Sequence, residues 1–248
     1  KKATTDLRRA NERLKKLDAA KSEFISIASH QLRTPLTVIK GYISMMIEGS
    51  FGDFSEQAQD SLKKVFESNE RLIKLVENLL NISRIESGRL KFNYELIQFE
   101  DMIDSVVWEL SENAKSKGIG LEYKRLKRAL PKVKIDTEKI RQVVMNLVDN
   151  AVKYTNKGKV VVRLRKVGSN LVFSVKDNGI GITEEDMPNL FKKFARGTSA
   201  SLEHTEGTGL GLYVAKQMIT SHKGEIWAES KGEGKGTTFV FELPIVKD

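Results

Sequence analysis

The first 88 residues carry apolar side chains at helical spacing, and this pattern constrains the fold more than any other feature of the chain. The apolar positions alternate between three and four residues apart, interrupted only at Lys21, and run through Leu7, Ala10, Leu14, Leu17 and Phe24. This heptad spacing is typical of a coiled coil. We therefore expect residues 1–20 to form a coiled-coil helix that enters from an upstream segment.

The helical pattern continues to about residue 48 and then begins again in a second helix. We expect the first helix over 4–48, because apolar residues recur at Ile27, Ala28, Ile39, Ile43 and Met46. A turn-rich stretch at 49–53 follows, and Ser55 has the residue type of an N-cap. The second helix is predicted to reach about Ile85, with a wide apolar face at Leu62, Val65, Phe66, Leu72, Ile73, Val76, Leu79 and Leu80.

Two such apolar faces cannot be covered within a single helical hairpin. A dimer would bury them in a four-helix bundle, and we expect this arrangement. The alternative is that the hairpin packs on the rest of the same chain.

After Gly88 the pattern changes to short strands alternating with helices. Strands are predicted near 91–97, 119–125, 132–135, 159–167, 170–177, 224–230 and 236–243, and helices near 99–117, 136–154, 184–192 and 209–222. From residue 159 onward the order is a strand hairpin, two helices and a terminal strand hairpin, which is typical of an α/β two-layer sandwich with its helices on one sheet face. Residues 193–208 lack periodicity and are rich in Gly, Thr and Ser, so we expect a mobile loop.

Composition excludes some function classes without selecting one. The chain has no cysteine, which excludes a disulfide framework and a thiolate metal site and favours an intracellular compartment. The net charge is +9, but Lys and Arg are spread among Asp and Glu, so we expect no nucleic-acid partner. No apolar run of about 18 residues suggests a membrane-spanning helix. Because the chain begins at Lys1 rather than Met, we expect a fragment that lacks upstream segments.

The helix predicted over 136–154 carries the first residues that could bind a ligand. Asn146 and Asn150 are four residues apart, so their amides share one helix face, with Lys153 and Tyr154 one turn further along. A neutral amide oxygen is a suitable ligand for Mg²⁺. A lysine ammonium is a compact positive charge that can bind phosphate electrostatically.

Two glycine-containing segments follow this helix. The first is Asp177-Asn-Gly179-Ile-Gly181-Ile182, directly after a predicted strand. A carboxylate accepts hydrogen bonds, so Asp177 can bind the exocyclic amine of adenine and would repel the carbonyl of guanine. Glycines without a Cβ atom let a base approach the backbone. The second segment is Gly207-Thr208-Gly209-Leu210-Gly211, which opens a helix where free N–H groups and the helix dipole attract phosphate.

Two familiar nucleotide-binding motifs are missing from the sequence. Neither the G-x-x-x-x-G-K-[ST] phosphate loop nor the G-x-G-x-x-G dinucleotide motif occurs, which disfavours the folds that use them.

Taken singly, each of these elements has an ordinary explanation as exposed amides or as turns, but their order and spacing are distinctive. Together they resemble the N box and two glycine boxes of an ATP-binding superfamily that includes histidine kinases, gyrase B, the ninety-kilodalton heat-shock chaperone and MutL. Phe191 and Phe194, followed by Arg196, resemble its phenylalanine box, and Gly234-Lys-Gly236-Thr237 resembles a further glycine box.

The resemblance implies ATP and Mg²⁺ as cofactors, with the Asn150 amide on the metal ion. The residues that it implies around the nucleotide are Asn146, Asn150, Lys153, Tyr154, Asp177, Gly179, Gly181, Ile182, Phe191, Phe194, Arg196, Gly207, Thr208, Gly209, Leu210, Gly211 and Thr237.

One position separates the members of this superfamily. Its ATP-hydrolysing members carry Glu four residues before the Asn that binds Mg²⁺, where the Glu activates water. Here that position is Asn146, and an amide cannot take a proton. We therefore expect the chain to spare ATP from hydrolysis and to pass the γ-phosphoryl group to another acceptor.

A candidate acceptor lies in the first helix. The segment from Phe24 to Leu36, with His30 near its centre, closely resembles the H box of the dimerisation and phosphotransfer domain of histidine kinases. A neutral imidazole carries an in-plane lone pair, so His30 can attack phosphorus without prior deprotonation. Pro35 removes the helix bond to the carbonyl of Gln31 and is expected to kink the helix.

The sequence departs from the family directly after the histidine. The family usually has Glu or Asp there to accept the ring proton, whereas Gln31 can orient the ring N–H but cannot hold a proton. Thr34 matches the position that orients water when related kinases dephosphorylate their partner. The resemblance therefore implies catalytic roles for His30, Gln31 and Thr34.

We interpret the chain as a homodimeric histidine autokinase whose phosphohistidine passes its phosphoryl group to an aspartate of a response-regulator receiver domain. A signalling helix at 1–20 precedes the dimerisation and phosphotransfer domain at 21–88 and the catalytic ATP-binding domain at 89–248. The upstream sensor domain is expected to be absent from this fragment. We expect a cytoplasmic location, with membrane tethering through missing upstream segments left open.

Two other functions compete with this interpretation. Gln31 suggests an ATP-binding signalling scaffold with weak or lost kinase activity. The nucleotide-binding motifs alone would also suit a chaperone-type or mismatch-repair-type ATPase.

Overall fold

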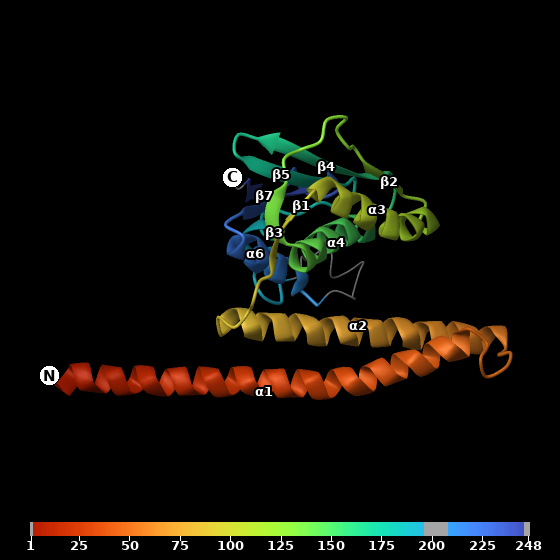
Figure 1. The fold of residues 1–248 in the computed structure, drawn as a ribbon. Coiled ribbons are helices and arrows are strands. Elements are labelled where there is room, and N and C mark those ends of the chain that lie inside the picture. The colour runs from red at the N-terminus through yellow and green to blue at the C-terminus, as the bar shows by residue number, and fades with distance from the viewer. Residues whose placement is uncertain (1, 196–207, 246–248) are drawn as a thin grey trace. The chain divides into compact units, whose positions relative to one another are not determined.

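A computed structural model describes residues 2–195 and 208–245, with side chains described from residue 12 onward except at 14–16, 18 and 19. The chain divides into two compact units, Lys1–Lys91 and Phe92–Asp248. The first unit is a helical hairpin and the second an α/β domain (Figure 1). Across the described residues, no helix is both long and apolar enough to cross a membrane.

The first unit consists of α1 (Lys2–Ile47) and α2 (Glu56–Glu86), within two residues of the predicted helix ends. Helix α1 continues without a break through Pro35, and Figure 1 shows that it bends along its length. The prediction of Ser55 as N-cap is confirmed, since its side-chain oxygen accepts a hydrogen bond from Ala58 N at 3.4 Å.

Polar contacts fix the register of the two helices. Asn69 Nδ2 on α2 donates to the Leu36 carbonyl on α1 at 2.9 Å, and Ser83 Oγ donates to the Ser22 carbonyl at 3.2 Å. Buried amides and hydroxyls must find partners, so these bonds favour one alignment of the helices.

The hairpin leaves much of its apolar surface exposed. Large exposed side chains on α1 and α2 are Leu17, Phe24, Ile27, Leu32, Val38, Ile39, Tyr42, Met45, Val65, Leu72 and Leu75. So many large apolar side chains exposed along two helices indicate an interaction face.

The second unit contains two sheets. Strands β1 (Tyr94–Ile97) and β3 (Val133–Asp136) form an antiparallel pair. The five-stranded sheet has the order β2-β4-β5-β7-β6, in which β2 pairs parallel with β4 and the other pairs are antiparallel. Its strands are β2 (Gly120–Tyr123), β4 (Lys159–Val167), β5 (Asn170–Lys176), β6 (Glu225–Ser230) and β7 (Thr237–Pro244).

Three helices cover one face of the five-stranded sheet, as predicted: α3 (Phe99–Ser116), α4 (Thr137–Lys153) and α6 (Gly211–Ser221) (Figure 1). Alternate residues of β5 are buried toward the helices, which is the pattern of a strand with one covered face. The Phe173 and Phe241 rings stack in this core with their centroids 4.8 Å apart. The ring centroid of Phe99 on α3 lies 6.1 Å from that of Phe241.

The prediction of a helix over 184–192 is wrong. The structure has only a short 3₁₀ helix there, Met187–Asn189, with Pro188 in its first turn and no buried residue. Phe194 then adopts a positive φ of 59°. A short segment without a packed apolar face cannot stabilise a helix, because most helical stability in proteins comes from tertiary packing.

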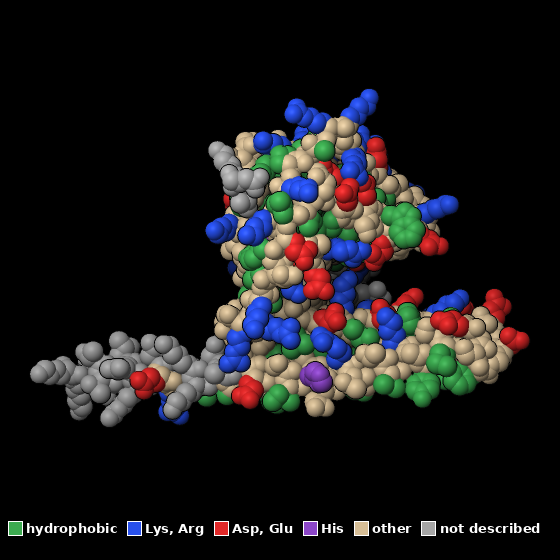
Figure 2. All heavy atoms as spheres, in the orientation of Figure 1, with side chains coloured by type: hydrophobic (Ala, Val, Ile, Leu, Met, Phe, Trp, Pro, Cys, Tyr) green, Lys and Arg blue, Asp and Glu red, His purple; other side chains and the backbone are tan. Residues whose placement is uncertain are grey.

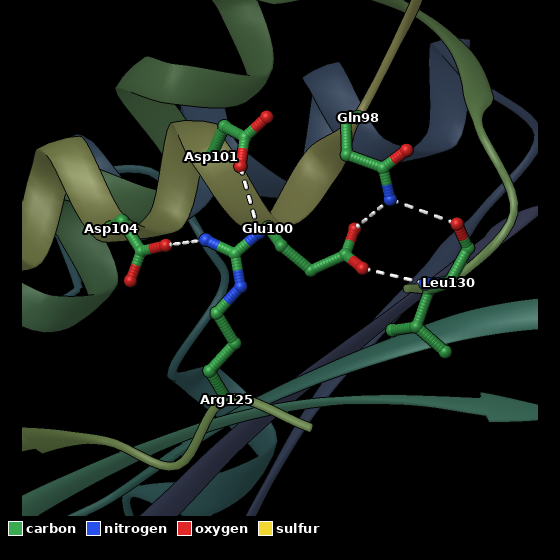
Figure 3. Close-up of polar contacts among 6 residues, drawn as sticks. All are labelled: Gln98, Glu100, Asp101, Asp104, Arg125 and Leu130. Carbon is green, nitrogen blue, oxygen red and sulfur yellow. Dashed lines mark hydrogen bonds and ion pairs between the residues drawn. The ribbon is translucent and has the colours of Figure 1, made fainter. Parts of the chain in front are cut away.

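Polar contacts at the start of α3 hold the connection between β2 and β3 (Figure 3). The Glu100 carboxylate, 2% exposed, accepts hydrogen bonds from Leu130 N and Gln98 Nε2, both at 2.7 Å. The Arg125 guanidinium bridges the carboxylates of Asp101 and Asp104. These bonds tie the start of α3 to a long loop and hold that corner of the α/β domain in place.

Candidate functional site

Asp177 lies directly after β5 and is 4% exposed. Its Oδ1 atom accepts hydrogen bonds from Gly179 N at 2.8 Å and from Thr237 N at 3.0 Å. Burial raises the pKa of the Asp177 carboxyl, and the two N–H donors partly oppose that rise. Among the described residues, Oδ2 receives no hydrogen bond from the protein, so it is available to a donor on a ligand.

The glycines after Asp177 allow three backbone segments to meet. A Cβ atom on Gly179 would lie 2.2 Å from the Tyr154 carbonyl oxygen, and one on Gly181 would lie 2.1 Å from the Gly232 carbonyl oxygen. Gly181 also has a positive φ of 74°, which residues with side chains rarely adopt. Ile180 N donates to the Tyr154 carbonyl at 3.1 Å, so this loop is fixed against the end of α4.

The Asn146 amide of α4 lies beside the start of α6. A Cβ atom on Gly211 would lie 2.4 Å from Asn146 Oδ1, so this glycine permits the two helices to approach. The Asn146 Nδ2 atom is buried and has no hydrogen-bond partner among the residues that the structure describes. Such an orphaned donor is costly unless a ligand satisfies it, and here it lies next to a helix N-terminus that attracts anions.

The remaining predicted residues of α4 are partly exposed. Asn150 and Lys153 lie on the helix, and Tyr154 is its C-cap. The Lys153 ammonium lies 5.5 Å from the centre of the Tyr154 ring. Ile182 is also partly exposed, whereas Thr237 is buried and bonded to Asp177 through its N–H. The structure therefore brings the N-box residues and the first glycine box to one end of the domain.

The predicted phenylalanine box lies on both sides of the limit of the described residues. The centre of the Phe191 ring lies 5.7 Å from Nζ of Lys216 on α6. The Phe194 side chain is 67% exposed. Arg196 and Gly207 lie outside the described residues, as does most of the loop predicted over 193–208. Thr208, Gly209 and Leu210 lead into α6, where Thr208 Oγ1 accepts a hydrogen bond from Leu210 N at 3.3 Å.

Ser230 is the polar residue of this site that sequence reasoning missed. It ends β6, accepts a hydrogen bond from Ile182 N in the loop after Asp177, and donates one to the Gly236 carbonyl. A serine at a strand end before a glycine turn carries no distinctive sequence signal, because its partners lie far away in the chain.

The candidate acceptor histidine belongs to the other unit. His30 is exposed on α1, and Gln31 and Thr34 are exposed as well. Figure 2 shows a histidine side chain, in purple, at the surface of the hairpin. The Thr34 hydroxyl donates a hydrogen bond to the His30 carbonyl at 3.4 Å. Ser29, by contrast, is buried toward α2 and 1% exposed. An exposed imidazole beside a packed turn is accessible to a reactant.

Comparisons with known proteins match both units. Residues 20–88 match the His Kinase A (phospho-acceptor) domain, and residues 135–247 match the Histidine kinase-, DNA gyrase B-, and HSP90-like ATPase. The sensor histidine kinase WalK of Bacillus subtilis is 38% identical over 236 residues, which are 94% of this chain and 38% of WalK. The sensor protein SrrB of Staphylococcus aureus is 32% identical over 229 residues, 92% of this chain and 39% of SrrB. The chain therefore spans less than half of these relatives.

Two solved structures align with most of this chain. Full-length ShkA in complex with AMPPNP aligns with a TM-score of 0.73 at 25% identity, over 91% of this chain and 46% of that one. The histidine kinase AdeS of Acinetobacter baumannii aligns with a TM-score of 0.62 at 29% identity, over 88% of this chain and 98% of that one.

The order of the two matches, a phospho-acceptor domain followed by a histidine kinase-type ATPase domain, defines the class of this chain by its domains. Its two domains match those of the catalytic core of the sensor histidine kinases.

Proposed function

We propose that this chain binds Mg·ATP in its α/β domain, transfers the γ-phosphoryl group to His30, and passes it on to an aspartate of a receiver domain. The observation that carries the proposal is the buried Asp177 carboxylate, held by two backbone N–H groups at one oxygen and open at the other. The same chain carries an exposed histidine within an H box.

The nucleotide site suits adenine at one end and phosphate at the other. Asp177 Oδ2 would accept a hydrogen bond from the exocyclic amine of adenine, a charge-assisted bond that gains strength in a buried site. The buried Asn146 Nδ2 donor and the start of α6 are complementary to phosphate oxygens.

The amide of Asn150 is the proposed ligand for Mg²⁺. No group of three or more His, Asp or Glu side chains that could hold a metal ion occurs among the described residues. Mg²⁺ at nucleotide sites keeps several waters and takes few protein ligands beside the phosphates, so a single amide oxygen is compatible with binding the ion there. When bound, the ion neutralises the charge that develops on the phosphate oxygens.

In the first step an imidazole nitrogen of His30 would attack the γ-phosphorus of ATP. A phosphorus–nitrogen bond forms, the bond from phosphorus to the β,γ-bridging oxygen breaks, and ADP leaves. The proton on the other ring nitrogen would be oriented by the Gln31 amide oxygen and lost to solvent. In the second step an aspartate carboxylate of the partner would attack phosphorus, the phosphorus–nitrogen bond breaks, and the ring takes up a proton from solvent, which restores the neutral imidazole.

Several further assignments belong to this proposal. The chain would act as a homodimer through residues 21–88, with 89–248 as the catalytic domain and 1–20 carrying the signal from an upstream sensor. The partner would be a response-regulator receiver domain, and the location would be cytoplasmic. The exposed apolar side chains of α1 and α2 support the dimer, because two hairpins would cover them.

Gln31 favours a second candidate, an ATP-binding scaffold that transfers no phosphoryl group. Incubation with γ-labelled ATP distinguishes the functions. A label on the protein that is lost in acid and survives base indicates a phosphohistidine and therefore the kinase. Release of free labelled phosphate alone would indicate an ATPase, and neither product would indicate a scaffold.

A further inference from the structure

Two glycine loops of the nucleotide site are bonded to each other through their backbones. The first is the loop 177–182 and the second is the turn 231–236. Gly234 N donates to the Ile180 carbonyl at 2.6 Å, and Gly236 N donates to the Gly179 carbonyl at 3.1 Å. The first loop therefore depends on the second for its conformation.

The Ser230 hydroxyl connects these two loops. Its Oγ atom accepts a hydrogen bond from Ile182 N at 3.0 Å and one from Gly232 N at 3.3 Å. It donates to the Gly236 carbonyl at 2.8 Å, with the Gly232 carbonyl at 3.3 Å as a second acceptor. One hydroxyl thus serves as donor and acceptor between both loops, which is the full capacity of a serine side chain.

The bond to Gly236 links Ser230 to Asp177. The Gly236 carbonyl and the Thr237 N–H belong to the same peptide group, and that N–H donates to Asp177 Oδ1 at 3.0 Å. Fixing the carbonyl fixes the peptide plane, and hydrogen bonds at both ends of a peptide group strengthen each other. Ser230 therefore orients the donor that holds the Asp177 carboxylate.

We propose that Ser230 is a positioning residue for recognition of the adenine amine, acting through the Gly236–Thr237 peptide on Asp177 and through Ile182 N on the first glycine loop. The inference rests on the proposed function, in which Asp177 binds that amine. Without the hydroxyl, the Ile182 and Gly232 N–H groups lose their acceptor and the Thr237 N–H loses its orientation. The Asp177 carboxylate is then less firmly oriented toward the adenine amine.

The test compares ATP with purine riboside triphosphate, which lacks the exocyclic amine. Equilibrium dissociation constants are measured for both nucleotides with the full chain and with Ser230→Ala. The parent is expected to prefer ATP. Ser230→Ala is expected to weaken ATP binding about fivefold to thirtyfold, the range of one or two lost hydrogen bonds, while purine riboside triphosphate loses much less, so that the preference falls.

Ser230→Thr is the conservative control, because it keeps the hydroxyl, and it is expected to retain the parental preference to within about twofold. Circular dichroism verifies that each variant is folded. If Ser230→Ala does not fold, Ser230→Cys keeps the size of the side chain with a weaker donor, and the same fall in preference is expected. An equal loss for both nucleotides, or an unchanged preference, would overturn the inference.

The two proposals fail in different ways. A parent protein that binds ATP no better than purine riboside triphosphate would contradict the assignment of Asp177 and with it the proposed nucleotide site. A parent that prefers ATP, with that preference intact in Ser230→Ala, would overturn only the role of Ser230.

Discussion

Gln31 follows His30, the proposed acceptor, on α1 and is exposed beside it. After phosphoryl transfer the ring of His30 still carries its second proton and a positive charge. A carboxylate at position 31 would stabilise that charge as it develops and could take the proton, whereas an amide oxygen supplies only a hydrogen bond.

Gln31→Glu is therefore expected to speed autophosphorylation by at least about tenfold, a cautious fraction of the 10²–10⁴-fold that a positioned general base supplies. Affinity for ATP should change little, because the substitution lies in the helical hairpin and not in the α/β domain. The measurement is the initial rate of labelling at saturating Mg·ATP. Gln31→Met, which keeps the size without the hydrogen bond, should be slower than the parent. A Gln31→Glu rate equal to the parental rate would contradict the general-base argument.

Residues of the nucleotide site differed in how far the sequence could reveal them. Asp177 and Gly181 could be proposed from the sequence because they occur in the order and spacing of a known superfamily, although each alone has an ordinary explanation as part of a turn. Ser230 was not predictable, since its partner Ile182 is 48 residues away and the bond depends on how two loops fold together. Arg196 and Gly207 lie outside the described residues, so their predicted roles stay predictions.

Among the elements, α4 and α6 are joined through a histidine that the nucleotide site does not use. His222, the C-cap of α6, is buried, and its Nε2 accepts a hydrogen bond from Asp136 N at 2.9 Å. Its Nδ1 lies 2.7 Å from the Met218 carbonyl and donates to it. The rings of Phe92 and Tyr94 pack against it. These contacts require the neutral imidazole with its proton on Nδ1.

Burial lowers the pKa of His222 below its ordinary value of 6.5, although the Met218 carbonyl and Asp136 partly oppose the shift. The unfolded chain then binds more protons than the folded one, so stability rises with pH. We expect the α/β domain to lose stability as the pH falls below about 6.5, by up to about 1.4 kcal/mol per pH unit from this one group.

Urea unfolding followed by tryptophan fluorescence measures this effect, since Trp108 and Trp227 both lie in the α/β domain. His222→Gln is the control, because its amide oxygen can accept the Asp136 N–H but does not titrate. The parent should lose more stability than His222→Gln between pH 7.5 and 5.5. Equal losses in the two proteins would remove His222 as the cause.

Most elements were predictable because their apolar periodicity agrees with the way they pack. Strands β4 and β5 were found within one residue of their ends, and α3 was as well. The segment 184–192 misled the prediction because Met187, Leu190 and Phe191 have helical spacing, yet none of them is buried in the structure. Periodicity predicts a helix only where a neighbouring surface covers the apolar face.

On the scale of the whole molecule, the proposed dimer rests on the exposed apolar side chains of the hairpin. Leu72 is 51% exposed on α2, and Val65, 50% exposed, is one heptad earlier on the same helix face. Burying a leucine side chain fully contributes about 1.5–3 kcal/mol. We expect residues 1–88 to sediment as a helical dimer.

Leu72→Asp should raise the dissociation constant of that dimer more than about tenfold, as a loss of 1.4 kcal/mol or more requires. Lys63→Asp also introduces an aspartate but lies on the opposite face of α2, and it should leave the dimer nearly unchanged. Sedimentation equilibrium measures both. A monomeric parent fragment, or equal effects of the two substitutions, would exclude the four-helix bundle.

The central claim is that His30 accepts the γ-phosphoryl group of ATP. The chain has three histidines, His30, His204 and His222, so the position of an acid-labile label can be decided by substitution. The direct measurement is labelling of the parent and of His30→Gln with γ-labelled ATP, with a fluorescent ATP analogue titrated against both. We predict that His30→Gln loses the label completely and binds the analogue within about twofold of the parent, since the substitution removes no group of the nucleotide site. An acid-labile label that persists on His30→Gln would contradict the account.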